Sequence, residues 1–274
     1  RDKIDRLVVD KIGLGHTPAP APEDWERFVQ RVIHPKHKVT IAVAGKYIEL
    51  QDAYKSIYES LIHAGAHHDT KVRIVRVDTE AIEDHGAKSV IGEVDGILVP
   101  GGFGDRGTEG KILAAQYARE KKIPYFGICL GMQIATIEFA RNVCGLAGAN
   151  STEFDKSTKH PVICLQEEQK GVEDMGATMR LGSCESILFA GTRAAELYGN
   201  KERIHERHRH RYEFNNEYRD RLQEAGLVIS SVSAEEGLVE IIELPNHPFF
   251  IGAQFHPEFQ SKPNHPHPLF AGFV

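Results

Sequence analysis

The sequence has no long hydrophobic run, and its charges are nearly balanced. No stretch approaches the roughly 18 consecutive apolar residues that a membrane-spanning helix needs. The N-terminal RDKIDRLVVD lacks the apolar core of a secretory signal peptide. A formal net charge of −6 on 274 residues gives no support for a nucleic-acid or anionic-membrane partner. We therefore expect an ordinary soluble globular protein.

Cysteine is also scarce. The chain has only 4 cysteines and no Cys-x-x-Cys pair. This number is small for a disulfide framework in a chain of this length, and the spacing does not fit a paired redox motif. We expect free thiols in a reducing, cytoplasmic setting.

Residues 1–38 differ in composition from the rest and predict an interdomain linker. The segment HTPAPAP at 16–22 is rich in proline, and 23–33 has the pattern of a short amphipathic helix. The chain begins with Arg1 rather than Met and ends where a helical pattern starts, in HPLFAGFV. We therefore expect a fragment of a longer protein, with one domain at 39–274 that is truncated at its C-terminus.

From residue 39 onward, strand and helix patterns alternate. Strand patterns occur at 39–45, 71–77, 95–100 and 123–128, and helical patterns at 51–66, 108–122 and 131–143. This alternation predicts a mostly parallel central sheet flanked by helices, with the ligand crevice beyond the carboxyl ends of the strands. After about residue 150 the chain has short strand candidates, at 161–166, 177–182, 204–214, 226–232, 237–244 and 249–255. The predicted fold class is α/β, with an additional antiparallel β-rich part.

The segment IPYFGICLGMQ places Cys129 between an apolar strand pattern and a helical one. Gly127 and Gly131 flank the cysteine, as in the nucleophile elbow G-x-S-x-G, where a Cβ at either position would clash with the turn. The helix N-terminus favours a thiolate, and the amide N–H of Leu130 could donate to an oxyanion. The pentapeptide alone equally allows a small buried hydrophobic residue at this position.

A cysteine nucleophile needs a base, and the segment FHPEF offers His256 with Glu258 two residues later. On a strand, side chains two residues apart point the same way, so Glu258 could hold the imidazole. A lone His-Pro-Glu is more commonly a surface turn, and this alternative stays open at this point.

The loop GILVPGGFGDRGTEG at 96–110 follows another strand pattern. Its glycine pair lets the backbone approach a ligand, so Gly102 could supply a second oxyanion donor. The loop also matches the dinucleotide fingerprint G-x-G-x-x-G. That motif needs an acidic residue about twenty positions further on, where this chain has Cys129. We therefore do not favour nicotinamide binding.

Taken together and in this order, PGGFG, GICLGMQ and FHPEF resemble the class I glutamine amidotransferases, a flavodoxin-like fold with a Cys-His-Glu triad. NSTEFD, ERHRHRYEFN and HPFFIGAQFHPEFQSKP further resemble the glutaminase domain of the CTP synthase family, from about Val39 onward. The leader resembles the segment that joins this domain to a synthetase domain, which is absent here.

The resemblance implies a role for each matching residue. Cys129 would be the nucleophile, His256 the base and acid, and Glu258 its orienting partner, with Gly102 and Leu130 as oxyanion-hole donors. The family's glutamine-binding positions fall on Gly102, Leu130, Gly131, Met132, Gln133, Glu153 and Arg211. Arg106 matches a position tied to activation by GTP.

The resemblance implies that L-glutamine is the substrate, that it is hydrolysed to glutamate and ammonia, and that this domain itself binds no cofactor. Mg²⁺ and ATP belong to the absent synthetase domain, which would use the ammonia to convert UTP to CTP. The full-length family forms homotetramers, and we expect this piece to be monomeric or weakly associated.

Other interpretations stay open. ERHRHRYEF could suggest a metal or RNA site, although alternating charges more often line a solvated face or a cleft, and no cysteine is placed to complete a zinc site. The motifs could also belong to the glutaminase partner of a GMP or carbamoyl phosphate synthetase, to a γ-glutamyl peptidase, or to an inactive binding module.

Overall fold

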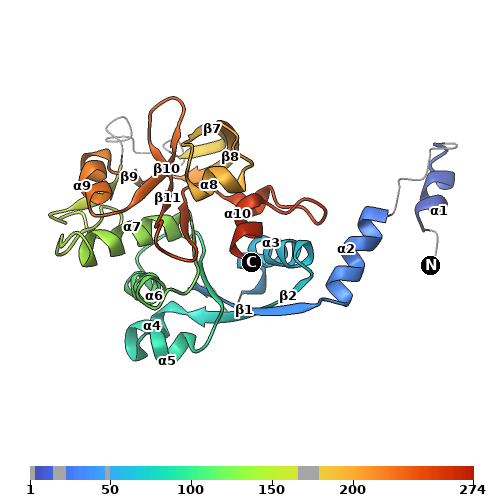
Figure 1. Ribbon diagram of the computed structural model, residues 1–274, viewed down its shortest axis with the longest axis horizontal. Helices are drawn as coiled ribbons and strands as arrows, with labels where there is room; N and C mark the ends of the chain where they lie inside the picture. The colour runs from blue at the N-terminus through green and yellow to red at the C-terminus, as the bar shows by residue number, and fades with distance from the viewer. Residues whose placement is uncertain (1–3, 15–22, 47–49, 166–178) are drawn as a thin grey trace.

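The structure is a computed structural model that describes residues 4–14, 23–46, 50–165 and 179–274. Its centre is a nine-stranded sheet with the order β2-β1-β3-β4-β12-β11-β10-β7-β8 (Figure 1). The strands of one half are β1 His37–Gly45, β2 Thr70–Asp78, β3 Gly96–Val99, β4 Tyr125–Ile128 and β12 Phe250–Ala253. Those of the other half are β7 Arg180–Leu188, β8 Arg203–His210, β10 Val228–Ser233 and β11 Val239–Glu243.

The sheet is parallel in its first half and antiparallel in its second. Each neighbouring pair from β2 to β12 is parallel, and each pair from β12 to β8 is antiparallel. The sequence predicted both a parallel part and an antiparallel part. It did not predict that the antiparallel strands continue the same sheet, because this depends on β12, late in the chain, pairing with β4 and β11. A small separate sheet is formed by β5 Asn150–Ser151, β6 Pro161–Cys164 and β9 Glu213–Phe214.

Helices cover both faces of the sheet. One face carries α4 Thr79–His85, α5 Ala87–Ile91, α6 Thr108–Lys121, α7 Leu130–Asn142 and α9 Arg219–Glu224. The other carries α3 Lys55–His67, α8 Arg193–Leu197 and α10 Pro268–Phe273. Residues of β1 alternate between the two cores: Ala42 and Ala44 face the first, and Ile41 and Val43 the second. Burial on both faces explains why β3, β4 and β12 are nearly continuous apolar runs, whereas the edge strand β2 keeps charged residues.

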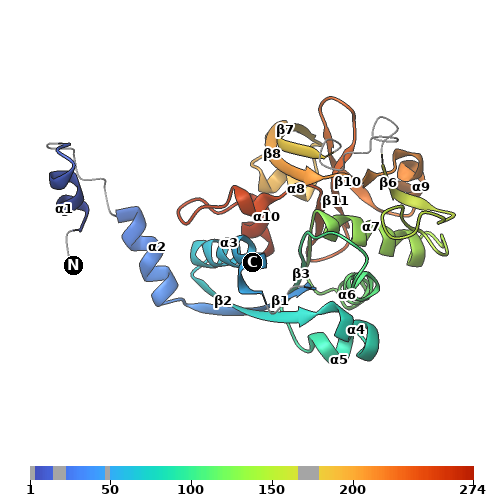
Figure 2. The same ribbon diagram turned by 180° about the vertical axis from the view of Figure 1, so that it is seen from behind.

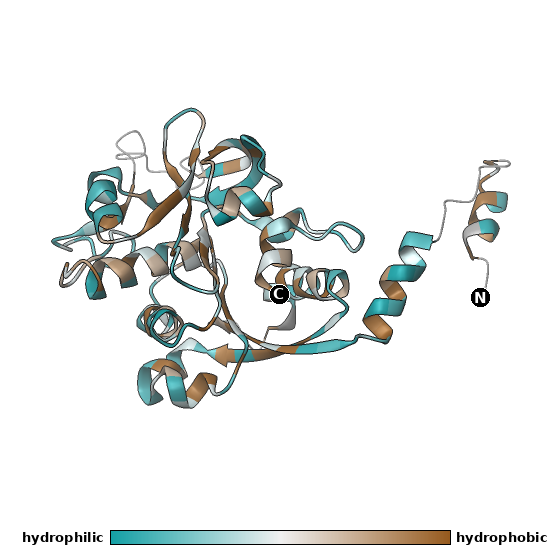
Figure 3. Cartoon of the chain, in the orientation of Figure 1, coloured by the Kyte–Doolittle hydropathy of each residue, from teal (hydrophilic) through white to brown (hydrophobic). Residues whose placement is uncertain are grey.

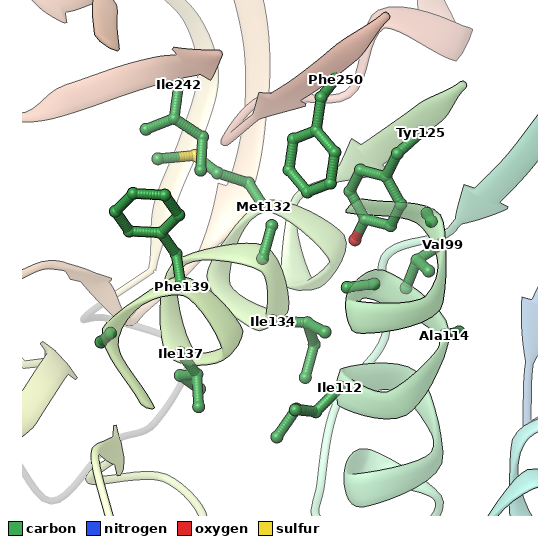
Figure 4. Close-up of a cluster of buried hydrophobic side chains, with 14 of the residues drawn as sticks. Val99, Ile112, Ala114, Tyr125, Met132, Ile134, Ile137, Phe139, Ile242 and Phe250 are labelled. Carbon is green, nitrogen blue, oxygen red and sulfur yellow. The ribbon is translucent and has the colours of Figure 1, made fainter. Parts of the chain in front are cut away.

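Helix α7, which follows the cysteine, is held by the first of these cores. In Figure 4, Met132, Ile134, Ile137 and Phe139 of α7 lie among side chains from α6 and from the strands. The rings of Tyr125 on β4 and Phe250 on β12 stack with centroids 4.5 Å apart. The packing fixes the start of α7 against the ends of the strands, where the motifs lie.

The leader contains two helices, α1 Ile4–Lys11 and α2 Glu23–Ile33, which extend from one end of the body in both views (Figures 1 and 2). The helix at 23–33 was predicted, whereas α1 was not. Hydrophilic and hydrophobic residues alternate along α2 (Figure 3). The ring of Phe28 packs edge-on against His63 of α3, with centroids 6.1 Å apart. The proline-rich stretch at 16–22 lies outside the described residues.

Other differences from the predictions are local. Helices α4, α5, α8 and α9 were not predicted, and all four are short. The strand expected at 177–182 begins at Arg180, and residues 177 and 178 lie outside the described ones. Within the described ranges, no helix combines the length and the apolar character needed to cross a membrane.

Candidate functional site

Three motifs that are far apart in the sequence meet at one edge of the sheet. Strands β3, β4 and β12 are parallel neighbours, with Val99 opposite Gly127 and Ile128 opposite Ala253. Their carboxyl ends therefore bring the loop after β3, the cysteine after β4 and the histidine after β12 to the same place. This is where the topology of an open α/β sheet favours a ligand site.

Cys129 sits on a strained turn between β4 and α7. Its backbone has φ 52° and ψ −102°, an unusual conformation for a non-glycine residue, and its N–H donates to the Ala253 carbonyl at 2.7 Å. A Cβ on Gly131 would lie 2.1 Å from the Val99 carbonyl oxygen, and one on Gly127 would lie 2.6 Å from the Gly131 carbonyl. The steric requirement for both flanking glycines, predicted from the sequence, is confirmed.

The histidine and the glutamate of FHPEF are in contact. His256 Nδ1 lies 2.8 Å from Glu258 Oε1, and the His256 backbone N–H donates to the Arg207 carbonyl at 2.8 Å. The expected strand geometry is wrong, because β12 ends at Ala253 and residues Pro257–Phe259 form the 3-10 helix η4. The chain turns at Pro257, and this turn brings the carboxylate to the imidazole.

The environment of His256 favours its protonated form. Burial lowers the pKa of this imidazole, but its interactions with the Cys129 sulfur and with Glu258 outweigh burial and raise the pKa to about 10. At neutral pH His256 is therefore an imidazolium beside the cysteine sulfur. An imidazolium in this position can donate a proton to a group that leaves beside the sulfur.

Cys129 borders two cavities. The larger has a volume of about 530 Å³ and is lined by Gly102, Phe103, Gly104, Cys129, Leu130, Gln133, Glu153, Met179, His210, Arg211 and Tyr212. The smaller has a volume of about 200 Å³, and His256, Glu258 and Arg209 are among its lining residues. The first accommodates a small substrate, and the second reaches the same sulfur from the histidine side.

Most of the residues predicted to bind a ligand line the larger cavity. Its walls include an acidic side chain, Glu153, and a basic one, Arg211. Burial raises the pKa of Glu153, and the 3.0 Å hydrogen bond that it accepts from the Gly104 N–H partly offsets this effect. Gly102 lies against Leu130, since a Cβ added to Gly102 would be 3.6 Å from Leu130 Cδ2. Gly102 and Leu130 thus contact each other at the wall of this cavity.

Three predicted residues lie elsewhere. Gly131 and Met132 are not among the described residues that line the cavity: Gly131 packs against the Val99 backbone, and Met132 is fully buried in the core. Arg106 is half exposed, with its Nε 3.6 Å from Glu80 Oε1. Its guanidinium also donates to the Lys46 carbonyl at 3.4 Å.

Sequence reasoning missed several lining residues. Phe103, Gly104, Met179, His210 and Tyr212 belong to the cavity, and two of them flank Arg211 in the sequence. This adjacency could have indicated His210 and Tyr212, and the position of Phe103 and Gly104 directly after Gly102 in PGGFG could have indicated those two. The other missed residue is Gln254, whose side-chain Nε2 lies 3.7 Å from Cys129 Sγ.

The alternating segment on β8 has one buried face. Along Arg203–His210 the residues alternate between exposed and buried, with His208 and His210 on the inner face. The expectation of a solvated or cleft-lining face therefore fits the exposed outer residues and also His210, which lines the larger cavity, whereas His208 is buried. Among the described residues, no group of His, Cys, Asp and Glu is arranged to hold a metal ion.

The inner face of β8 belongs to a buried polar cluster. His208 Nδ1 is 3.0 Å from His210 Nε2, and Arg180 of β7 lies 2.6 Å from Glu240 of β11. Burial, together with the positive charge of Arg180, lowers the pKa of His208 to about 2 and that of His210 to about 3. Burial raises the pKa of Glu240 to about 7, although Arg180 opposes this.

Comparison with known proteins gave matches over most of this chain. The family model for glutamine amidotransferase class-I matches residues 49–274. The CTP synthase of Caldanaerobacter subterraneus subsp. tengcongensis is 55% identical over 274 residues, which cover 100% of this chain and 51% of that protein. The CTP synthase of Trichlorobacter lovleyi is 54% identical, with the same coverage. The chain thus spans about half the length of the curated relatives it matches.

A solved structure is also similar to this chain. The glutaminase domain of Trypanosoma brucei CTPS, with bound acivicin, is 42% identical and superposes with a TM-score of 0.80. The match covers 86% of this chain and 92% of that one.

Proposed function

Because this chain belongs to the class I glutamine amidotransferase family, we propose that it hydrolyses L-glutamine to glutamate and ammonia, as the glutaminase domain of a CTP synthase. One observation carries the proposal: Cys129, on its strained elbow, borders the same cavity as Gly102, Leu130, Glu153 and Arg211, while the paired His256 and Glu258 border the adjoining one.

The first chemical step follows from the resting charges. With His256 protonated, the Cys129 thiolate attacks the amide carbon of glutamine, and the carbonyl oxygen becomes an oxyanion. The N–H groups of Gly102 and Leu130 stabilise that oxyanion. Leu130 suits this role because it is the first residue of α7, where helical amides have no carbonyl partner within the helix.

The second step returns the site to its resting state. His256 gives its proton to the departing nitrogen, ammonia leaves, and a thioester remains on Cys129. The now neutral imidazole takes a proton from water, whose oxygen attacks the thioester carbon. The carbon–sulfur bond breaks, and glutamate and the thiolate form. Glu258 holds the imidazole in position throughout through its contact at Nδ1.

Substrate recognition depends on the two charged side chains of the cavity. A free amino acid carries a carboxylate and an ammonium group. Arg211 suits the carboxylate, which a guanidinium binds in a fork, and Glu153 suits the ammonium. The buried position of Glu153 strengthens such a pairing, because little water screens it.

The proposal extends to the part of the protein beyond this chain. The ammonia would serve a synthetase domain that uses ATP and Mg²⁺ to convert UTP to CTP, within a homotetramer. GTP would activate the glutaminase, with Arg106 as a contact. The half-exposed guanidinium of Arg106, on the loop that also holds Gly102, is compatible with this role.

The test is an assay of glutamate release from glutamine, with and without GTP. We expect Cys129→Ala to reduce the activity to background and the matched control Cys144→Ala to retain it, because Cys144 borders neither cavity. Activity that persists in Cys129→Ala would refute the proposal. If the wild-type chain releases no glutamate, labelling by an electrophilic glutamine analogue decides: modification of Cys129 supports a glutamine site, and its absence contradicts it.

A further inference from the structure

We propose that Gln254 is a further catalytic residue, whose side-chain amide donates a hydrogen bond to the Cys129 thiolate. This inference rests on the proposed function and adds to it a residue that neither the motifs nor the resemblance indicated. Gln254 lies between the end of β12 and His256 and is fully buried. Its Nε2 lies 3.7 Å from Cys129 Sγ, a distance that fits a hydrogen bond to sulfur.

The backbone fixes where this side chain starts. The Gln254 N–H donates to the Glu240 carbonyl of β11 at 2.8 Å, just beyond the last residue of β12. The Cys129 N–H donates to Ala253, the preceding residue, at 2.7 Å. The amide side chain and the thiol are therefore held by the same neighbouring strands, and their contact does not depend on a loop.

The orientation of the amide follows from a chain of hydrogen bonds. The carbonyl oxygen of Tyr212 can only accept, so the end of the Gln133 side chain that lies 2.9 Å from it must be the NH₂ group. That same NH₂ group lies 3.2 Å from the Gln254 amide, which must therefore present its oxygen. The remaining end of Gln254, facing the sulfur, is then the NH₂ group. One acceptor at the far end thus determines that a donor points at Cys129.

This donor has a distinct chemical effect. Cys129 is almost fully buried, so water contributes little to stabilising a negative sulfur. A hydrogen bond to an ionised group is about twice as strong as one between neutral groups. Unlike His256, a carboxamide does not titrate, so Gln254 favours the thiolate at every pH. It therefore raises the thiolate fraction without competing for the proton that the leaving ammonia needs.

The chain of hydrogen bonds also connects the sulfur with the substrate cavity. Gln133 and Tyr212 both line the larger cavity, and Tyr212 follows Arg211 directly. A ligand held by Arg211 would thus bind beside the carbonyl that orients the two amides.

The experiment measures alkylation of Cys129 by iodoacetamide as a function of pH, with the whole chain and without glutamine. Gln254→Met keeps the size of the side chain but loses the donor. In this variant we expect the pH at which alkylation reaches half of its maximal rate (the midpoint) to rise by about one pH unit, which corresponds to a tenfold smaller thiolate fraction below the midpoint. In Gln254→Leu, which also lacks the donor and has a branched apolar side chain, the midpoint should rise by a similar amount. The control Gln260→Met removes a partly buried amide that contacts Glu206 instead of the sulfur, and should leave the midpoint unchanged.

Glutamine turnover supplies a second readout. The loss of kcat/KM in Gln254→Met should shrink as the pH is raised above the new midpoint, with KM little changed, whereas a loss of packing would persist at every pH. A midpoint equal to that of the wild type in a folded Gln254→Met would overturn the proposal, as would an equal shift in Gln260→Met. If Gln254→Met does not fold, Gln254→Leu is decisive in the same way. Because alkylation does not involve glutamine, an inactive wild type would count against the glutaminase proposal alone.

Discussion

The two halves of the nine-stranded sheet differ in the kind of side chain that their strands bury. In the parallel half, β3, β4 and β12 are fully buried and apolar, and the reactive groups appear only where the strands end. In the antiparallel half, ionisable groups lie inside: Arg180, His208 and Glu240 come from three different strands.

Because they bury different side chains, the two halves contribute differently to the candidate site. An apolar parallel half gives a rigid platform from which a strained turn can project a thiol. The buried polar cluster of the antiparallel half lies beside the cavity, since His210 lines it and contacts His208, whose Nε2 is 3.7 Å from Glu240. Buried ion pairs contribute little net stability over apolar packing, but breaking one is costly. We therefore expect the two halves to respond differently to substitution.

The largest effect is expected in the antiparallel half, from Arg180→Met. This change leaves Glu240 and Glu213 buried without their cation, and removal of one partner from a buried pair costs about 3–5 kcal/mol. The measurement is urea unfolding between pH 5 and pH 9.

The sign of the pH dependence follows from Glu240. Its pKa in the folded chain is raised to about 7 from 4.5, so the folded state binds more protons than the unfolded state between these values. Stability from this group is therefore present below pH 4.5 and falls as the pH rises to about 7. Without Arg180 the folded pKa rises further and the fall extends to higher pH, so the variant should be most destabilised in alkali. A destabilisation that is constant across the range would contradict a role for charge.

An intermediate effect is expected in the parallel half, from Gly131→Ala. The added Cβ would lie 2.1 Å from the Val99 carbonyl, a backbone atom that cannot move without displacing β3. Overpacking of this kind costs about 1–3 kcal/mol or more, and it should also abolish glutamine hydrolysis by shifting the elbow. Thermal unfolding and the glutamate assay measure the two effects. The control Gly226→Ala has φ 104° but open space, and should cost about 1 kcal/mol while activity is retained.

The smallest effect is expected on the outer face of the antiparallel half, from Arg203→Gln. Arg203 pairs with Glu185 at 2.6 Å, but half of its side chain is exposed. Exposed pairs contribute about 0–1 kcal/mol and are weakened by salt. We expect Arg203→Gln to lower the free energy of unfolding by an amount within this range in dilute buffer and to leave it unchanged in high salt. A decrease in the free energy of unfolding as large as that in Arg180→Met would contradict the idea that solvent exposure makes the Arg203–Glu185 pair weaker than the buried Arg180–Glu240 pair.

The sequence predicted the parallel half well and the polar interior poorly, for a physical reason. The ends of apolar strands and their glycines are local signals, so the order of residues alone placed the cysteine elbow and the loop with Gly102. The alternation on β8 was also visible, but the partners that bury His208 come from other strands. Gln254 stands two residues before His256 and was still missed, because its role depends on the contact with Cys129 across the sheet. The turn that brings Glu258 to His256 was predicted with the wrong geometry.

The insertion of β12 between β4 and β11 also has a consequence during synthesis on the ribosome. Gln254 follows Cys129 by 125 positions, and His256 and Glu258 come shortly after it. At about 5–20 residues per second the nascent chain therefore carries its cysteine for on the order of ten seconds before these residues are translated. During that interval the edge of β4 that β12 will occupy has no partner. The pairing of β12 with β4 therefore closes the sheet and brings Gln254 and His256 to the Cys129 sulfur in the same step. A chain that stalls before this point exposes the apolar edge of β4 together with a thiol that lacks its neighbours.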